Sequence, residues 1–530
     1  MQYILDTSNY KNFKLLSTKT ATEQQSFDGA AAANRCLPGD IITLDESGIV
    51  LHTRAKHPPL AGHLQTLTKT IYGMTSSGTP LYLFTPFNKA YPAMRVGANK
   101  MDRTHNYLVV VKFDSWLPED SLPRATLESV IGRADNRDTE EKALLINASP
   151  YWKSKLPENP TLPLITDRLI ISSETGWETI NIDPQGCLDI DDTFSWRQAS
   201  GSSTNYEVAI GISDVAAAIT EGSLLDLNAA RNCQTIYDLE GRALRPMFPA
   251  ELSENTLSLL PGPLSKPTVS LLFTFDLVDR QISNQHFAIT ATQNNTTYTY
   301  ESAMKATAKP LLQLITQAIQ LQIPALANED ATDPHIWIQA LMVFYNIKAA
   351  PHAAVTRSHS APAADKLAQY KEVLPELAVF AMDAAKYTHP STCQPHYGFS
   401  SMYCHVTSPI RRYADLINQR ALKDSLNGRQ QQIQGTTLYQ LNTHQKLAKS
   451  YQRDLFFTRE LYDGPRIVSA IVIAYDRKKS KLHLYVSKWK RIIKVQAEPQ
   501  PIKQEVKVSF VYNSSNAHYK DRLVCRVIPI

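Results

Sequence analysis

The sequence predicts a multidomain α+β protein in which two small β modules precede a large mixed domain and a third β module follows it. Three observations lead to this expectation. At 530 residues the chain is too long for one ordinary core, because domains of about 100 to 200 residues are typical. Strand-like runs punctuated by Gly, Pro and Asn occupy the parts before residue 165 and after residue 465. Between these parts, strands give way to long helical patterns.

The predicted modules occupy four ranges along the chain. Residues 1–62 contain "FDGAAAANRCLPGDIITLDESGIVLHT", a pair of strand-like runs separated by turn residues. Residues 63–165 contain the buried-type strand "YLVVVKFDSW" and then "LESVIGRADNRDTEEKALL", which passes from a strand through a turn to a helix. Residues 166–464 hold strands at "YEVAIGISDVA" and "SLLFTFDLV" and helical patterns at "DKLAQYKEVLPELAVFAMDAAKY" and "SPIRRYADLINQRALKDSL". Residues 465–530 are strand-like again.

The composition limits the classes of protein to consider. A hydrophobic content of 43% and a charged content of 20% are typical of a soluble globular protein. Since no run of about 18 apolar residues is present, a membrane role is not expected. The N-terminus has neither a signal peptide's apolar stretch nor the Arg-rich character of a transit peptide. The six scattered cysteines show no metal-ligand spacing, so we expect a reducing compartment and a cytoplasmic location.

The net charge of +5 hides a basic C-terminal segment. From Arg466 onward there are fourteen Lys or Arg and four Asp or Glu, an excess of +10 that leaves −5 for the first 465 residues. The cations alternate with Tyr475, Tyr485 and Trp489 on strand-like runs. Such a mixture suits a small barrel that binds single-stranded nucleic acid, with Trp489 and Lys490 as candidate contacts. A solvated basic face with ordinary core aromatics is the alternative.

Residues 182–192, "IDPQGCLDIDD", crowd Asp183, Asp189, Asp191 and Asp192 into one turn-rich stretch. Like charges this close repel and raise each other's pKa values unless a cation lies between them. Carboxylates are ligands for Mg²⁺, which prefers one or two of them together with substrate phosphate oxygens. Two such ions about 4 Å apart bind the attacking and leaving oxygens of a phosphoryl displacement. An acidic surface loop is the alternative.

The stretch "YCHVTSPIRRYADLINQRAL" contains a second candidate site. Ser408 is a natural N-cap and Pro409 a natural first helical residue, so a helix is expected to begin here. Arg411 and Arg412 would then lie in its first turn and, with the free backbone N–H groups, form a site for a phosphodiester. The alternative is that Arg411 pairs with Asp415 at i,i+4.

Isolated aromatic and histidine residues are a weaker signal. Tyr237 in "CQTIYDLEG" and Tyr300 in "TYTYESA" are able to stack on or hydrogen-bond to a nucleotide, and a place in the core is the alternative for each. His359 and His396 are equally ambiguous, and neither has neighbours at metal-ligand spacing.

Together these motifs resemble the RNase II (RNB) family of 3′-to-5′ exoribonucleases, which includes exosome-type catalytic subunits. "IDPQGCLDIDD" resembles the family's acidic signature, and "HYGFSSMYCHVTSPIRRYADLINQRAL" resembles its arginine-bearing signature. Four blocks between them are similar to family blocks in the same order: "IGISDVAAAI", "QTIYDLEG", "RPMFPAELSENTLSLLPG" and "TRSHSAPAADKL". Upstream, "FDGAAAANRCLPGDIITL" resembles the first cold-shock barrel and "VVVKFDSWLPEDSLPRATLESVIGRADNRDTE" the second.

The resemblance implies a fold and an activity. It implies cold-shock/OB barrels at 1–62 and 63–165, a mixed α/β RNB catalytic domain at 166–464, and an OB-type RNA-binding barrel at 465–530. Single-stranded RNA would enter from its 3′ end and be hydrolysed to 5′-nucleoside monophosphates. The cofactor would be Mg²⁺, with two ions during catalysis and Mn²⁺ as a substitute.

The resemblance also implies roles for individual residues. Asp183, Asp189, Asp191 and Asp192 would be metal ligands, and loss of Asp191 would abolish cleavage without abolishing RNA binding. Arg411 would hold the scissile phosphate and offset transition-state charge. The candidate RNA contacts are Tyr237, Tyr300, Arg412, Trp489 and Lys490.

The sequence departs from the family pattern in three places. Gln339 and Ala340, before Asn346, stand where the family carries a pair of glutamates that hold the 3′-terminal nucleotide. Gln419-Arg420 replaces the usual His-Arg. Since no endonuclease-type domain precedes the first barrel, we expect a monomer without stable exosome assembly.

Two alternatives to the exoribonuclease follow. The first is a catalytically weak RNA-binding or regulatory protein of the same family, for which the missing glutamates are the main support. All four aspartates and Arg411 are present, which favours the enzyme. The second, a DNA exonuclease, is disfavoured because family channels read the ribose 2′-OH.

Overall fold

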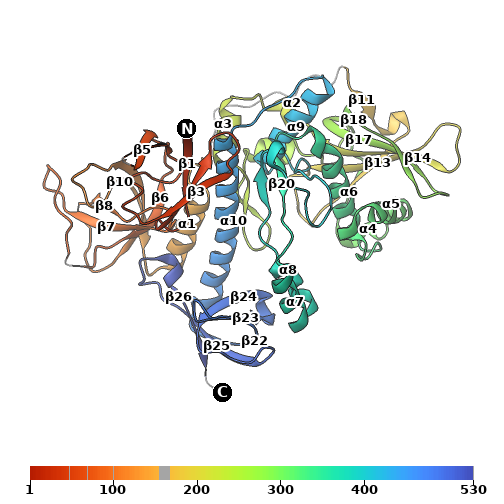
Figure 1. Cartoon of the computed structure of the whole chain (residues 1–530). Coiled ribbons are helices and arrows are strands. Elements are labelled where there is room, and N and C mark those ends of the chain that lie inside the picture. Colours follow the sequence, from red (N-terminus) through yellow and green to blue (C-terminus); the bar gives the residue numbers. More distant parts are fainter. Residues whose placement is uncertain (47, 69, 100, 154–166, 529–530) are drawn as a thin grey trace.

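The computed structural model describes residues 1–153, apart from 47, 69 and 100, and residues 167–528. It confirms the predicted order of β, β, large α+β and β. Figure 1 shows the two N-terminal modules on one side of the long helix α10 (Gly435–Leu461) and the large domain on the other, with the C-terminal sheet below. Within the described residues, no helix combines the length and apolar character needed to cross a membrane.

The first module is a five-stranded antiparallel sheet in the order β3-β2-β1-β4-β5. Its strands are β1 (Gln2–Thr7), β2 (Asn12–Ser17), β3 (Glu23–Asp28), β4 (Ile41–Asp45) and β5 (Gly48–Thr53). Residues such as Leu5 and Phe13 share one apolar cluster with Phe84 and Val109 of the second module. The two N-terminal modules therefore pack against each other and share one core.

The second module is a closed barrel in the order β10-β8-β7-β6-β9, followed by one helix. Its elements are β6 (Leu60–Leu64), β7 (Leu81–Pro86), β8 (Met94–Gly97), β9 (Tyr107–Ser115), β10 (Arg124–Arg133) and α1 (Arg137–Ala148). The predicted boundary at residue 62 is wrong by a few residues, because β6 already belongs to this barrel. The predicted boundary at 165 lies outside the described residues.

The large domain is built on a seven-stranded mixed sheet in the order β11-β18-β17-β14-β13-β12-β19. Its strands are β11 (Leu169–Ile171), β12 (Glu178–Ile182), β13 (Asp192–Gln198), β14 (Asn205–Ser213), β17 (Lys266–Asp276), β18 (Ile282–Thr292) and β19 (Thr296–Tyr298). Two short hairpins lie outside it, β15 (Ile236–Tyr237) with β16 (Ala243–Arg245) and β20 (Thr356–Ser358) with β21 (Lys386–Thr388).

Helices α4 (Tyr300–Ala303), α5 (Lys309–Gln322) and α6 (Pro334–Ala349) pack on this sheet and bury one of its faces. The other helices of the domain are α2 (Val215–Ala218), α3 (Leu224–Asn232), α7 (Ala364–Val373), α8 (Ala378–Ala381) and α9 (Tyr413–Leu426), of which α7 and α8 pack on the C-terminal sheet. Asp333 caps α6 by accepting from the His335 N–H, and Pro334 takes the first helical position. Trp337 and Phe344 of α6 then join Phe273 of the sheet in the largest apolar cluster.

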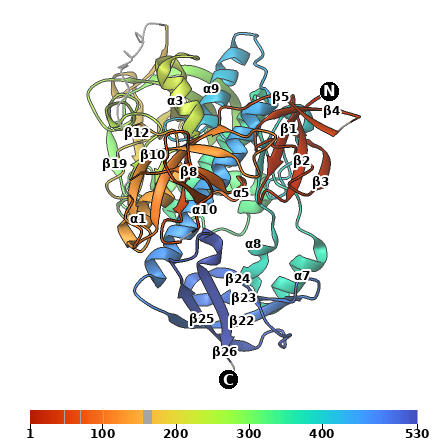
Figure 2. The same ribbon diagram turned by 90° about the vertical axis from the view of Figure 1, so that its left-hand side faces the viewer.

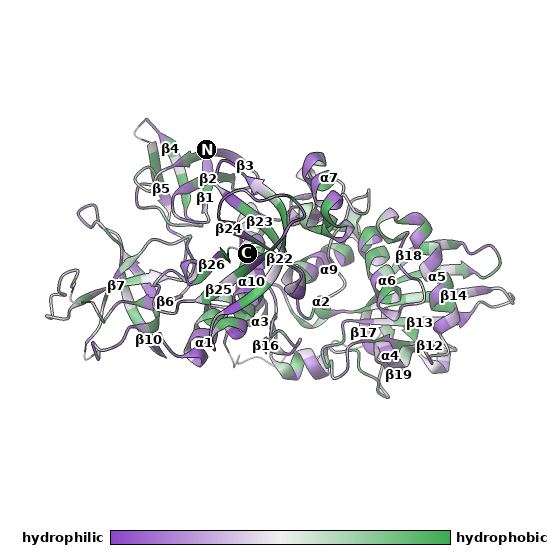
Figure 3. Ribbon diagram, turned by 90° about the horizontal axis from the view of Figure 1, so that it is seen from below, coloured by the Kyte–Doolittle hydropathy of each residue, from purple (hydrophilic) through white to green (hydrophobic). Residues whose placement is uncertain are grey.

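The C-terminal module is a five-stranded sheet in the order β24-β23-β22-β25-β26. Its strands are β22 (Arg466–Asp476), β23 (Lys481–Val486), β24 (Arg491–Gln496), β25 (Glu505–Tyr512) and β26 (Leu523–Ile528). Val472, Leu484 and Phe510 line its core together with Phe457 and Leu461 from the end of α10. Figures 2 and 3 show this sheet beside the lower end of α10. Its hydrogen bonding leaves it a half-barrel, whereas the second module closes.

The predicted helical pattern from Asp365 to Tyr387 is helical only in part. α7 ends at Val373, a 3₁₀ turn at Pro375–Leu377 separates it from α8, and Lys386 and Tyr387 belong to β21. Proline cannot donate to the helical ladder and disfavours helical geometry in the residue before it, which explains the break.

Candidate active site

The acidic stretch forms a loop that joins two neighbouring strands at one end of the large sheet. Asp183 directly follows β12 and Asp192 begins β13, and these strands pair antiparallel. The predicted turn is present, since the Cys187 N–H donates to the carbonyl of Pro184 at 3.1 Å and Gly186 adopts φ +80°. The connection at the end of these paired strands thus brings the aspartates together.

The carboxylates of Asp183, Asp189 and Asp191 each contact a different neighbour. Asp183 accepts from the Asn181 amide at 2.8 Å, and Asp189 accepts from the Tyr237 hydroxyl at 3.0 Å. Asp191 is 3% exposed and accepts from the Ile410 N–H and from Arg411 Nε, each at 3.0 Å. Tyr237 and Arg411, both singled out from sequence, therefore meet the acidic loop in space.

The electrostatics of the loop are those of crowded, buried anions. Burial raises the pKa of Asp191 to about 7, although the Arg411 charge acts in the opposite direction. Burial, followed by the charges of Asp183 and Asp191, raises the pKa of Asp192 well above its ordinary value. Burial also raises the pKa of Asp183, which the Asn181 hydrogen bond partly offsets. One arginine faces several carboxylates, so the site favours a further cation.

The arginines do not lie inside a helix, and the predicted helix start at Pro409 is wrong. The Arg411 and Arg412 N–H groups both donate to the Ser408 carbonyl in a turn, and α9 begins only at Tyr413. Arg412 has an extended backbone and forms an isolated β-bridge with Gln234. This tertiary pairing overrides the local capping signal.

The turn directs its two arginines to different carboxylates. Arg411 pairs with Asp191, not with Asp415, so the i,i+4 alternative is contradicted. Asp415 is fully buried and accepts from Arg412 Nη2 and from the Ser408 N–H, each at 2.8 Å. Arg412, a candidate RNA contact, is therefore occupied by a structural ion pair, while the Arg411 side chain remains 44% exposed.

Buried amides that the sequence reasoning missed hold this turn in place. Asn346 of α6 accepts from the Val406 N–H at 2.9 Å and donates to the Tyr403 hydroxyl at 3.1 Å. Gln419 of α9, fully buried, accepts from the Ala216 N–H at 2.9 Å and donates to the Ser213 carbonyl at 2.7 Å. Gln419, noted from the sequence only as a departure from the family, thus links α9 to the end of β14 by hydrogen bonds.

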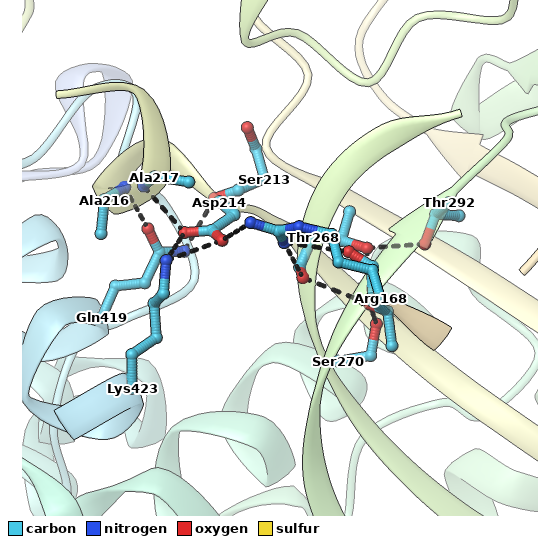
Figure 4. A network of polar contacts seen from close by, with 11 residues as sticks. Arg168, Ser213, Asp214, Ala216, Ala217, Thr268, Ser270, Thr292, Gln419 and Lys423 are labelled. Carbon is cyan, nitrogen blue, oxygen red and sulfur yellow. Dashed lines mark hydrogen bonds and ion pairs between the residues drawn. The ribbon is translucent and has the colours of Figure 1, made fainter. Parts of the chain in front are cut away.

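Asp214 anchors α9 to the sheet through a buried ionic network, shown in Figure 4. Its carboxylate accepts from Arg168 Nη2 at 2.8 Å, from Lys423 Nζ at 2.8 Å and from the Ala217 N–H at 3.1 Å. Arg168 also donates to the Thr290 carbonyl of β18 at 3.1 Å. Since α9 follows the arginine turn directly, the network helps to set where Arg411 meets Asp191.

A cavity of about 260 Å³ opens beside Arg411. The residues that line it include Tyr237, Arg411 and, from α10, Gln445 and Lys449. Burial lowers the pKa of Lys449. The cavity therefore offers cationic and hydrogen-bonding groups next to the acidic loop, as a bound phosphodiester requires.

The other predicted RNA contacts lie in different surroundings. Tyr300 stacks on His335 with ring centroids 3.8 Å apart, and burial and the charges of Asp183 and Asp192 raise its pKa to about 12. It therefore lies near the loop. Trp489 instead packs edge-on against Phe510 in the C-terminal core, at 4.7 Å between centroids, and Lys490 is exposed. The core alternative holds for Trp489.

The histidines and the two residues at the expected glutamate positions lie in the following surroundings. His359 and His396 contact each other at 4.9 Å between ring centroids, and burial lowers the pKa of His396 to about 4. Ala340 is fully buried in the large apolar cluster, whereas Gln339 is exposed. A carboxylate at position 340 would have to enter that core, so the family's glutamate grip has no counterpart there.

The donor set fits a magnesium ion by its chemistry. Asp183, Asp189, Asp191 and Asp192 offer hard carboxylate oxygens whose charges act on one another. Among the described residues, no three His, Cys, Asp or Glu side chains surround one point as a metal cage. Mg²⁺ does not need a cage, since it commonly takes one or two carboxylates and completes its shell with water and substrate oxygens.

Comparisons with known proteins match two parts of the chain to family models. A model of the RNB domain matches residues 174–315 and 307–428, and a model of the Dis3-like cold-shock domain 2 (CSD2) matches residues 81–149. The exosome complex exonuclease RRP44 of Mus musculus is 24% identical over 427 residues, which cover 64% of this chain and 44% of the relative. The chain spans less than half the length of the first curated relatives it matches.

Solved structures share the fold over nearly the whole chain. Mycoplasma genitalium RNase R in complex with ribose methylated single-stranded RNA has a TM-score of 0.70 at 16% identity, covering 100% of both chains. Yeast Ssd1, described as a pseudonuclease, has a TM-score of 0.72 at 16% identity, covering 97% of this chain and 81% of that one. At such identities the likeness shows the fold alone.

Proposed function

The chain belongs to the RNB family, and from this premise we propose that it is a magnesium-dependent hydrolytic 3′-to-5′ exoribonuclease. Its substrate would be single-stranded RNA and its products 5′-nucleoside monophosphates. The observation that carries the proposal is that Arg411, which lines a cavity of about 260 Å³, also contacts Asp191 of the acidic loop. The relatives named as exonucleases and the RNase R structure with single-stranded RNA support it.

The chain's own residues would bind and orient the scissile phosphate. Arg411 has Nε on Asp191 and Nη2 on Ser408 Oγ, each at 3.0 Å, so its guanidinium plane is fixed. Its exposed part faces the cavity, where Lys449 adds a second cation. A fixed arginine offsets charge that develops on a phosphate without reorganising during the reaction. Tyr237, which donates to Asp189, would hold that carboxylate in place.

Asp183, Asp189 and Asp192, with Asp191, would hold Mg²⁺, and Mn²⁺ would be an acceptable substitute. When bound, the metal would supply an activated water and charge neutralisation for an in-line displacement. We propose two ions during catalysis. We further propose that the chain acts as a monomer in a reducing, cytoplasmic setting.

A second candidate is an RNA-binding protein of this family with weak or no catalysis. The likeness to the Ssd1 pseudonuclease and the buried Ala340 favour it. Intact aspartates and Arg411 favour the enzyme. End-labelled single-stranded RNA and DNA of equal sequence, incubated with Mg²⁺ or EDTA and resolved at single nucleotides, separate the two. RNA shortened stepwise from its 3′ end only with Mg²⁺ supports the enzyme, and RNA bound but uncut supports the second candidate.

A further inference from the structure

A two-helix segment between strands β20 and β21, which we call the insertion, extends from the large domain to the C-terminal module and lies within the range that the RNB model matches. Strands β20 and β21 form a hairpin whose last pair is Ser358 opposite Lys386, and residues 359–385 lie between them. These residues contain α7 and α8. Figures 1 and 2 both show α7 and α8 beside the C-terminal sheet. The hairpin ends are adjacent, so the domain does not need the insertion to close its chain.

The insertion buries an apolar patch on the outer face of that sheet. Tyr370 and Leu377 of the insertion pack with Ile473 and Tyr485 of the sheet, and all four are buried. The alternate residues of the same strands, such as Leu484, point into the barrel core. The patch is therefore separate from the core, and two different surfaces of β22 and β23 are covered.

This outer face is where an OB-type barrel binds oligonucleotides. In that fold the second and third strands present the binding face, and here these strands are β23 and β24. Their outward positions carry Tyr485 opposite Ile492 and His483 opposite Lys494. Rings that stack on bases beside cations that meet phosphates are what single-stranded RNA requires.

Exposed cations continue the face beyond the insertion. The turn between β22 and β23 carries Arg477, Lys478 and Lys479, and all three are exposed. Within the described chain, no carboxylate lies within 4.0 Å of their charged groups as an ion pair. The aromatic part of the face, which would stack on bases, is thus covered. The cationic turn, which would contact phosphates, remains open to solvent.

The insertion makes an imperfect fit with the ring side of the face. His483 Nε2 is buried without a hydrogen-bond partner, and its Nδ1 is 3.5 Å from the Tyr370 hydroxyl. A buried polar atom without a partner is destabilising. Glu372 of α7 lies 3.6 Å from Lys503 of the barrel, so an acidic group of the insertion forms an ion pair with a cation of the barrel. RNA would supply hydrogen-bond acceptors and negative charge at the same places.

We propose that the α7–α8 insertion is an intramolecular cover over an RNA-binding face of the C-terminal barrel, and that single-stranded RNA displaces it. The inference rests on the proposed function, since it assumes that RNA is the ligand. With the cover closed, the barrel contributes only its exposed cations. With the cover open, Tyr485 and His483 join them, and the barrel gains stacking contacts.

The test compares RNA binding by closed and open chains in EDTA, where cleavage is stopped. The open variant replaces residues 362–383 by a Gly-Ser-Gly turn between the hairpin strands. Since one base stacked on an aromatic ring contributes a severalfold affinity gain, the open variant should bind labelled single-stranded RNA about fivefold more tightly or better. Adding Tyr485→Ala to the open variant should remove the gain.

Two measurements keep the test valid if the open variant aggregates. Leu377→Ala weakens the cover in an otherwise intact chain and should give part of the gain. Hydrogen exchange on the unaltered chain should show that added RNA speeds exchange in α7 and α8 while it slows exchange in β23 and β24. Unchanged or slower exchange in α7 and α8 with RNA bound would overturn the cover.

The outcomes also separate this inference from the proposed function. A parent chain that neither binds nor shortens RNA would refute the proposed function. A parent that binds RNA, combined with an open variant of equal or lower affinity, would refute the cover alone.

Discussion

Replacing Arg411 by lysine should slow cleavage at least about tenfold, which corresponds to about 1.4 kcal/mol in the barrier. Arg411 uses Nε for Asp191 and Nη2 for Ser408, and the exposed part of its fork is left for the phosphate. A lysine ammonium on a flexible stem cannot keep both contacts in one plane and present a further donor. Each lost charge-assisted bond is worth about 1.5 to 3 kcal/mol when buried, and exposure of the side chain reduces that figure.

The assay is single-turnover cleavage of a short single-stranded RNA, with thermal unfolding measured in parallel. Arg420→Lys is the matched control. Arg420 lies on α9, seven residues after Tyr413; it pairs with Asp226 at 2.9 Å and donates to the Ile219 carbonyl at 2.9 Å, whereas Arg411 contacts Asp191. The control should lose stability while its folded fraction cleaves at a rate within about threefold of the parent.

Normal cleavage by folded Arg411→Lys would refute the phosphate role and leave the arginine as a partner of Asp191 only. Equal slowing in Arg420→Lys would show that any loss of an ion pair around α9 disturbs the site. Asp415→Ala is unsuitable as a harmless comparison, because Asp415 is fully buried and holds the Ser408 turn.

Four further predictions follow from particular contacts. Asp191→Asn should stop cleavage while RNA affinity, measured by fluorescence anisotropy, changes little; cleavage at the parent rate, or in EDTA, would contradict the metal site. Reversing the cations at 477–479 to glutamate should weaken RNA binding and flatten its dependence on salt, because fewer counterions are released; an unchanged salt slope would make this turn a solvated surface. Gln419→Leu should lower the free energy of unfolding by about 2 kcal/mol, measured with denaturant, since the Ser213 carbonyl and Ala216 N–H lose their buried partner. Burial lowers the pKa of His444 from 6.5 to about 4, so its stabilising contribution is present above pH 6.5 and lost as pH falls toward 4. His444→Gln should therefore flatten the fall of unfolding free energy by about 1.4 kcal/mol per pH unit in that window, and an unaltered slope would show that this histidine protonates in the folded chain.

Much of the site was predictable because its chemistry is local in sequence. Asp183 to Asp192 lie in one short connection between two strands, so the crowding of negative charge was evident from the sequence. The partner arginine was also identified, since Arg411 stands beside a capping signal. The order of the modules was predictable from the change between strand and helix patterns, although the boundary inside β6 was not.

The rest depended on pairings between distant segments. The helix does not begin before Tyr413 because Arg412 has an extended backbone and pairs with Gln234, and no local pattern encodes that bridge. Trp489 lies among basic residues but packs on Phe510, because the 3₁₀ turn Ser487–Trp489 between β23 and β24 turns the ring toward the core. The structural role of Gln419 was not predictable either, because its hydrogen-bond partner, the Ser213 carbonyl, is distant in the sequence.

The helix α10 has a consequence for anyone who dissects or recombines this protein. Its 27 residues span about 40 Å, and its contacts run from Thr18 of the first module, through Glu141 of α1, to the C-terminal core. No cut between modules leaves that helix with all its neighbours. Chimeras should therefore exchange α10 together with the modules that pack on its two ends. Fragments that stop short of residue 435 would lose the helix on which these modules pack.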